Sequence, residues 1–211
     1  MKNFKIHLVR HGLTQGNIDG VYVGGRLDMP LSEEGAEELR KLSALYSYPV
    51  VGTLFSSPMK RALQSAEILF PAASERIVIE DLREIRFGEY EGKSVAELAQ
   101  DENFGKWLDP ESGYVPEGGQ SGQDFAAACA RALGNMFLHM AKNQIFEAAC
   151  VTHGGVIMSM LAQKAMPQRP PSQWMADCGT GYTVQANAAQ LLRDDLVEAV
   201  EIVPLGYLDD K

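Results

Sequence analysis

Positive charge is scarce in this sequence, which argues against partners that carry many negative charges. Its 19 lysines and arginines are outnumbered by 28 aspartates and glutamates, which gives a net charge of −9. Proteins that bind nucleic acid or anionic membranes in a general way carry basic surfaces instead. We therefore expect no nucleic-acid and no membrane partner. Against this acidic background, a local group of arginines is informative.

Cysteine and long apolar runs are also lacking. The three cysteines (Cys129, Cys150 and Cys178) are scattered and odd in number, which predicts buried thiols in a reducing compartment rather than a disulfide framework. No residues have metal-ligand spacing, so we expect neither a metal nor another cofactor. No apolar run is long enough for a signal-peptide core or a membrane span, which predicts a cytoplasmic protein.

The remaining pattern predicts one α/β domain over residues 1–211, since 211 residues with 45% hydrophobic content suffice for one sizeable core. Strands are expected at 4–9, 50–56, 76–79 and 148–152. Helices are expected after Ser32, from Ser57-Pro58 to about Phe70 with Pro58 in the first turn, after Ser94, and at 124–143 and 156–165. A surface loop at 110–122 and closing strands at 181–188 and 189–203, joined by a tight turn, complete the prediction. This alternation indicates βαβ units and a mainly parallel sheet.

Two of the four histidines follow predicted strands directly. His11 and His153 each end a short apolar run and precede a glycine. A side chain at the carboxyl end of a strand is well placed to meet a ligand in the crevice of an open α/β sheet. His7 lies inside the first strand and His139 inside a helix, so we interpret both as structural or surface residues.

Cationic and amide side chains near these histidines suggest a phosphate site. Arg61 lies three residues after Pro58, in the first turn of a predicted helix, where free N–H groups and the helix dipole favour anions. Arginine matches phosphate oxygens in pairs, and an asparagine amide donates one more hydrogen bond. Arg10, His11, Asn17, Arg61 and His153 could therefore surround one phosphate.

Phosphoryl transfer to a histidine also needs a proton donor for an alkoxide leaving group. The charged segment at 81–92 offers four carboxyl groups, those of Asp81, Glu84, Glu89 and Glu91. Spacing alone does not distinguish among them.

Taken together, four motifs in the same order resemble the histidine phosphatase superfamily, in its phosphoglycerate mutase-like branch. They are Leu8-Val9-Arg10-His11-Gly12-x-Thr14-x-x-Asn17, Ser56-Ser57-Pro58-x-x-Arg61-Ala62, Leu82-x-Glu84-x-x-Phe87-Gly88-x-x-Glu91-Gly92 and Val151-Thr152-His153-Gly154-Gly155. The resemblance covers nearly the whole chain and implies a three-layer α/β/α sandwich around a mostly parallel sheet.

The resemblance also implies roles for individual residues. His11 would be the nucleophile that becomes phosphohistidine, and Glu84 stands at the family's proton-donor position. The phosphoryl oxygens would be held by Arg10, Asn17, Arg61 and His153, with Gly24 and the Gly154 backbone N–H as further substrate contacts. The family needs no metal for this chemistry.

Branch-specific positions favour a hydrolase of a small phosphorylated metabolite. The acid phosphatase and phytase branch usually has arginine and aspartate where this chain has Gln15 and Gly154. Mutases carry basic residues after the glutamate segment, but 94–130 contains one cation, Lys106. The chain is similar in length to α-ribazole-phosphate and broad-specificity phosphatases. A cofactor-dependent phosphoglycerate mutase and a silent phospho-ligand binding module are the alternatives, and the predicted edge strand at 197–203 is a candidate homodimer contact.

Overall fold

The structure, a computed structural model, describes residues 3–109, 112–187, 189, 191, 193 and 195–207. Within these residues a seven-stranded sheet has the order β4-β3-β5-β1-β7-β8-β6. Its strands are β1 (Asn3–Arg10), β3 (Thr53–Ser56), β4 (Glu75–Val78), β5 (Glu147–Thr152), β6 (Ala165–Met166), β7 (Gly181–Asn187) and β8 (Val197–Val203). Only β7 runs antiparallel to its neighbours, β1 and β8. The sheet is mostly parallel, as the sequence predicts.

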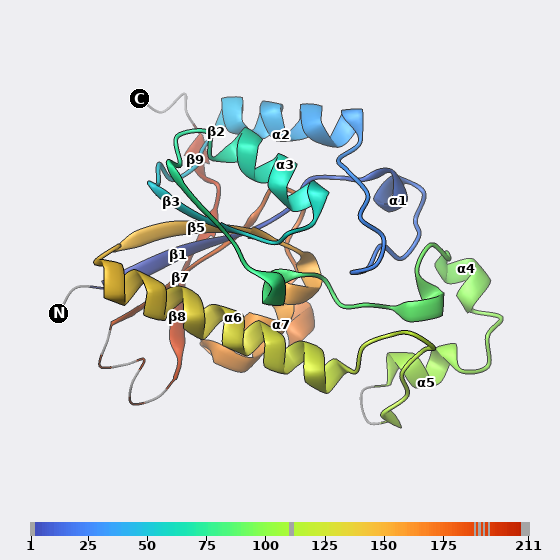
Figure 1. Ribbon diagram of the computed structural model, residues 1–211. Helices are drawn as coiled ribbons and strands as arrows, with labels where there is room; N and C mark the ends of the chain where they lie inside the picture. The colour runs from blue at the N-terminus through green and yellow to red at the C-terminus, as the bar shows by residue number, and fades with distance from the viewer. Residues whose placement is uncertain are drawn as a thin grey trace.

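Helices cover both faces of the sheet (Figure 1). One face carries α2 (Glu33–Leu45) and α3 (Lys60–Leu69), and the other carries α6 (Gly122–Asn143) and α7 (Gly154–Lys164). Strand β1 contributes side chains to the cores on both faces of the sheet, because successive residues of a strand point to opposite faces. Ile6 and Leu8 pack in the α6–α7 core, whereas Val9 packs in the α2–α3 core. This arrangement confirms the predicted three-layer fold.

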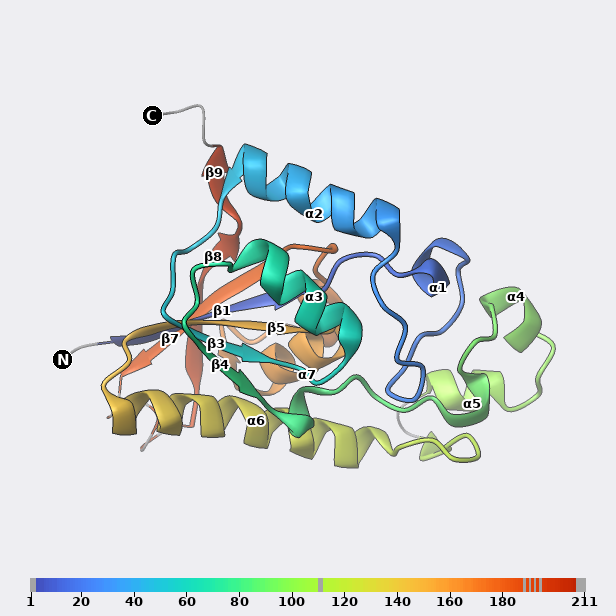
Figure 2. The ribbon, with the colours of Figure 1, turned by 45° about the horizontal axis from the view of Figure 1, so that its top comes forward.

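Shorter elements lie beyond the carboxyl ends of the strands (Figure 2). They are α1 (Gln15–Ile18), α4 (Val95–Leu98) and α5 (Phe104–Leu108). The remaining short elements are the 3-10 turns η1 (Glu80–Leu82), η2 (Gly88–Tyr90) and η4 (Pro171–Trp174) and a two-stranded sheet of β2 (Tyr46–Ser47) and β9 (Leu205–Tyr207). Buried Tyr90, Leu98 and Phe104 form a small third core with Trp107 packed against it. The α4–α5 region therefore has a small hydrophobic core of its own, separate from the two cores that flank the sheet.

Two expectations about element ends are wrong. Helix α3 begins at Lys60 with Met59 as its N-cap, so Pro58 precedes the helix, although Arg61 still lies in the first turn. Strand β8 begins only at Val197. The described residues just before it (Ala189, Leu191 and Arg193) are helical, as alanine and leucine favour. The two closing strands are therefore not joined by a tight turn.

Other expected elements need only small adjustments. Ser32, Ser94 and Ser121 accept hydrogen bonds from the first turns of α2, α4 and α6, as N-caps do. Helix α6 therefore begins at Gly122, two residues earlier than predicted. Pro110 and Glu111 of the predicted surface loop lie outside the described residues. In the described part of the chain, no helix combines the length and apolar character needed to cross a membrane.

Candidate active site

The structure brings the two strand-end histidines together. Strands β1 and β5 are parallel neighbours with Arg10 opposite Thr152, so His11 and His153 leave the sheet side by side. The backbone N–H of His11 donates to the Thr152 carbonyl at 2.9 Å. The two imidazole rings meet edge to face, with centroids 5.0 Å apart. His7 instead binds Thr183 and Glu147, and His139 binds Asn143, away from this pair.

Hydrogen bonds fix the tautomer of His11. Its Nδ1 lies 2.6 Å from the Gly12 carbonyl oxygen. Because a carbonyl only accepts, Nδ1 carries the proton and Nε2 keeps its lone pair. That Nε2 atom faces Arg61, whose Nε–H donates to it at 3.2 Å. His11 therefore presents an unprotonated nitrogen to the centre of the site.

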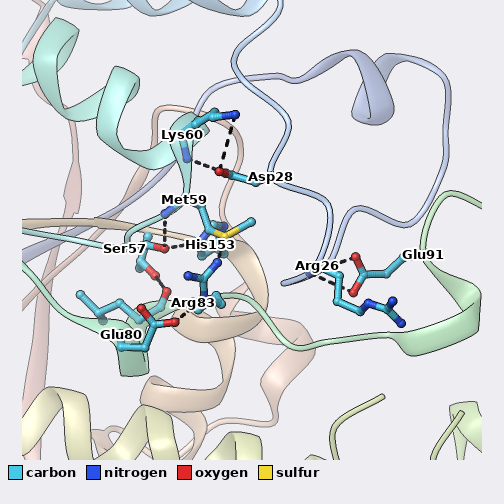
Figure 3. A network of polar contacts seen from close by, with 11 residues as sticks. Arg26, Asp28, Ser57, Met59, Lys60, Glu80, Arg83, Glu91 and His153 are labelled. Atoms are coloured by element: carbon cyan, nitrogen blue, oxygen red, sulfur yellow. Dashed lines mark hydrogen bonds and ion pairs between the residues drawn. The ribbon is translucent and has the colours of Figure 1, made fainter. Parts of the chain in front are cut away.

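His153 has the opposite tautomer. The same Arg61 Nε–H lies 3.3 Å from His153 Nδ1, so this nitrogen accepts and Nε2 carries the proton. His153 Nε2 donates to Ser57 Oγ at 2.8 Å (Figure 3). Ser57 was not singled out as a site residue from the sequence, although it stands in the strand-end motif with Pro58. It orients the His153 ring.

Arg61 is fully buried, and each of its three guanidinium nitrogens donates a hydrogen bond within the protein. Its Nη1 donates to the Leu27 carbonyl at 3.0 Å and its Nη2 to the Gly24 carbonyl at 3.2 Å. The part of Gly24 that contacts the site is its backbone carbonyl, which accepts a hydrogen bond from Arg61. A Cβ at Gly24 would come within 2.7 Å of Glu91 Oε1, so a side chain at this position needs rearrangement of the loop.

Arg10 has a buried donor with no partner. Its Nη1 donates to the Ala176 carbonyl at 2.8 Å, but its Nε is buried without a hydrogen bond. The Nε atom lies beside Gly154 at the N-terminus of α7, where a Cβ would be 3.5 Å away. Buried N–H groups are normally satisfied. An anion at this helix terminus would satisfy Arg10 and interact favourably with the helix dipole.

Burial and positive charge keep both histidines neutral. Burial is the main cause that lowers the pKa of His11 to about 3, and Arg61 and Arg10 lower it further. Burial is also the main cause that lowers the pKa of His153 well below its ordinary value, and its interactions with the neighbouring His11 and Arg61 lower this pKa further. Neutral imidazole at pH 7 is the form that a histidine nucleophile needs.

Glu84 lies beside this group and is 9% exposed. Its Oε1 accepts from the Ile85 N–H at 2.9 Å and its Oε2 from the Gly155 N–H at 3.0 Å. Burial raises the pKa of Glu84, while these two hydrogen bonds and the charges of Arg61 and Arg10 lower it in part. A carboxyl group with a raised pKa can donate a proton near neutral pH.

The other three carboxyl groups that spacing left open have different surroundings. Asp81 pairs with Arg131 on α6, and Glu89 accepts from the backbone N–H of Glu117. Glu91 accepts from backbone N–H groups in the neighbouring loops, including that of Arg26 (Figure 3). Glu84 is the one among these four carboxyl groups that is buried against the residues following His153.

Asn17 has no described hydrogen bond to the other residues predicted to surround the phosphate. Its Oδ1 accepts from the backbone N–H and the hydroxyl of Thr14, at 3.1 and 3.0 Å, and completes the capping box of α1. Its described hydrogen bonds do not join it to His11, Arg61 or His153. The Asn17 amide nitrogen is the group that remains for a ligand.

Arg83 is a further cation that sequence reasoning missed. Its Nε donates to Glu80 at 2.6 Å and its Nη1 lies beside the Met59 sulfur (Figure 3). Its charge contributes to the lowered pKa values of His153 and Arg61. Only its place before Glu84 in the charged segment could have indicated it.

Gly155 offers a direct test of how Glu84 is positioned. A Cβ here would lie 2.4 Å from Glu84 Oε1, so Gly155→Ala should displace the carboxyl group while the chain still folds. A misplacement of about 1 Å can cost roughly 10²-fold in rate, and we expect a loss of about that size in kcat. Gly134→Ala on α6 is the control, because a Cβ there meets nothing within 4 Å. Full activity of Gly155→Ala would show that the Glu84 position is unimportant.

The chain is similar in sequence and in fold to known proteins. Residues 6–181 match the family model "Histidine phosphatase superfamily (branch 1)". The chain is 26% identical over 187 residues to the adenosylcobalamin/alpha-ribazole phosphatase of Escherichia coli K12, covering 87% of this chain and 90% of that protein. It is 30% identical over 166 residues to the 2,3-bisphosphoglycerate-dependent phosphoglycerate mutase 2 of Gloeobacter violaceus, covering 74% and 73%. The fold is similar to that of phosphoglycerate mutase from Bacillus anthracis, with a TM-score of 0.70 at 17% identity over 95% and 92% of the chains.

Proposed function

This chain belongs to the histidine phosphatase superfamily, branch 1, and from that membership we propose that it hydrolyses a small organic phosphate monoester through a phosphohistidine on His11. The observation that carries the proposal is the orientation of His11. Its unprotonated Nε2 faces Arg61, and the buried, unpaired Nε–H of Arg10 lies beside the neighbouring helix terminus. A phosphoryl group between them would meet a nucleophile and two cations at once.

In the first step, His11 Nε2 attacks the phosphorus atom and a P–N bond forms as the ester P–O bond breaks. Arg10, Arg61 and the first N–H groups of α7 stabilise the charge on the phosphoryl oxygens. His153, neutral with its proton on Nε2, packs edge to face against His11. The Glu84 carboxyl group gives its proton to the leaving oxygen, so the product departs as an alcohol.

In the second step, water attacks the phosphohistidine and the P–N bond breaks. The Glu84 carboxylate takes the proton from that water, which returns the carboxyl group to its starting form. Inorganic phosphate leaves, and His11 regains its neutral Nε2. The same two side chains therefore serve both halves of the cycle.

Phosphoglycerate mutase activity is the second candidate, because the Gloeobacter relative is named for it. A mutase must also hold the carboxylate of its substrate. The stretch 94–130 offers one cation for this task, Lys106, whose Nζ donates to Asn103. This composition favours hydrolysis of a less acidic phosphate over mutase activity.

One set of assays separates the candidates. We expect hydrolysis of p-nitrophenyl phosphate and of alkyl phosphates, unchanged in EDTA. On 3-phosphoglycerate, with and without 2,3-bisphosphoglycerate, we expect mutase turnover slower than the best hydrolysis rate. Mutase turnover equal to or above that rate would reverse the assignment. Loss of activity in EDTA, restored by a divalent ion, would contradict the arginine–histidine mechanism, and complete inactivity would leave only a phosphate-binding module.

A further inference from the structure

A cavity of about 690 Å³ has none of the phosphate-site residues named above among its described lining residues. Ile85, which follows Glu84 directly, is one of its lining residues. Ser159 lines it from α7, four residues and about 6 Å of helix after Gly155, whose N–H binds the Glu84 carboxylate. Two lining residues are therefore close in the chain to the proton donor or its partner: Ile85 follows Glu84, and Ser159 lies about one helical turn after Gly155.

This position fits the alcohol part of a substrate. The group that protonates the leaving oxygen must lie within hydrogen-bond reach of it. His11 and the leaving oxygen stand roughly in line on opposite sides of the phosphorus atom. The alcohol must then extend away from His11 and past Glu84. The cavity, between α5, the first turn of α6 and the middle of α7, offers space beside that path; Figure 1 shows α5 beyond the N-terminal end of α6.

The walls of the cavity are built before any ligand binds. Gln163 Nε2 donates to the Ala126 carbonyl at 3.1 Å and to Ser159 Oγ at 3.1 Å, which ties α7 to α6. On the other side, Trp107 stacks on Phe104 with ring centroids 5.7 Å apart. Both walls are held by contacts within the protein, as in preformed ligand pockets of about 300–1,000 Å³.

The lining selects by charge. Asp109 is the one charged side chain among the described lining residues, and it is acidic. A carboxylate or second phosphate in the cavity would lose hydration without a cation to replace it. Trp107 and Tyr114 instead offer aromatic surface, and Gln120 and Gln123 offer amide groups for hydroxyls.

We propose that this cavity is the subsite for the leaving group, and that it selects an uncharged alcohol bearing a ring and hydroxyl groups over a small anionic one. The inference rests on the phosphomonoesterase function proposed above. Its lining residues would set the substrate preference, whereas the Arg10–His11–Arg61 group would act on any phosphate monoester.

Three probes measure the preference: adenosine 5′-monophosphate, glycerol 2-phosphate and 3-phosphoglycerate. Their leaving groups are a large uncharged ring alcohol, a small uncharged alcohol and a small anion. We expect kcat/KM to fall in this order, with at least roughly tenfold between the first and the last, the size that pocket contacts supply. A preference for 3-phosphoglycerate would overturn the inference while leaving the phosphatase function intact. Failure to hydrolyse these probes or p-nitrophenyl phosphate would overturn both.

Two variants localise the effect. Ala126→Trp should fill the cavity and lower the ratio of kcat/KM for adenosine 5′-monophosphate to that for glycerol 2-phosphate, again by roughly tenfold. Ala127→Trp is the matched control, because Ala127 is the adjacent, exposed residue of α6. Asp109→Asn, at an exposed position, should raise kcat/KM for 3-phosphoglycerate and remains informative if Ala126→Trp does not fold. Unchanged ratios in the folded variants would show that the alcohol binds elsewhere.

Discussion

Replacement of His11 by alanine should lower turnover of every phosphate monoester by at least roughly 10⁴-fold, the scale seen when an enzyme nucleophile is removed. The reason is that the variant lacks the proposed nucleophilic nitrogen. The Nε2 atom of the neighbouring His153 carries a proton that it donates to Ser57, so that nitrogen has no lone pair for attack on phosphorus. Steady-state hydrolysis of p-nitrophenyl phosphate measures the loss.

His139→Ala is the matched control for His11→Ala. His139 lies on α6, where it contacts Asn143 and the ring of Phe55, and has no described contact with the site. Its loss should leave kcat and KM unchanged. Near wild-type turnover of His11→Ala would rule out the proposed mechanism.

Glu84→Gln should have a large effect that depends on the leaving group. An alkoxide needs a proton to leave, so we expect a loss of roughly 10²–10⁴-fold on alkyl phosphates, the usual span for general acid catalysis. The p-nitrophenolate ion leaves without help, so phosphorylation of His11 by p-nitrophenyl phosphate should be affected much less. Hydrolysis of the phosphohistidine still needs Glu84 to activate water. Stopped-flow measurement should therefore show a burst of p-nitrophenol followed by slow turnover.

The wild type and Glu84→Gln should also differ in their pH dependence, because burial raises the pKa of Glu84. The acid form is present below this pKa and is lost as the pH rises through it, so wild-type kcat/KM on an alkyl phosphate should fall on the alkaline side. Glu84→Gln should lack that part of the fall, while ionisation of the substrate affects both enzymes alike. Equal losses on alkyl and aryl substrates, with no burst, would mean that Glu84 only positions the phosphate. Glu89 and Asp81 would then be the carboxyl groups to test.

The features that the sequence predicted best are those with local causes. Arg10 and His11 follow an apolar strand, and His153 follows another, so each side chain had to appear at a strand end. Family motifs then related these positions to one another. That β1 and β5 are adjacent in the sheet is a long-range property, which periodicity does not contain.

Spacing alone could not choose among the carboxyl groups, because the choice depends on burial and therefore on the whole fold; the family resemblance selected Glu84. Glu84, Glu89 and Glu91 look alike in a charged segment, but the backbone turns Glu84 toward the Gly155 N–H and Glu91 toward the loop at Arg26. The positions of Ser57 and Arg83 were hidden for the same reason, since both act through neighbours distant in sequence. Two element ends were predicted wrongly because the local sequence signal for them is weak. They are the start of the helix placed at Pro58 and the start of the strand placed at Ala189.

The central claim is that the phosphoryl group passes through His11 Nε2. Rapid quenching of Glu84→Gln during the burst with p-nitrophenyl phosphate, followed by peptide mass spectrometry, tests it most directly. The account predicts one phosphoryl group on the peptide that contains His11, stable in base and lost in acid, and none in His11→Ala. A burst with no phosphorylated peptide, or with the phosphoryl group on His153 or a carboxylate, would contradict it.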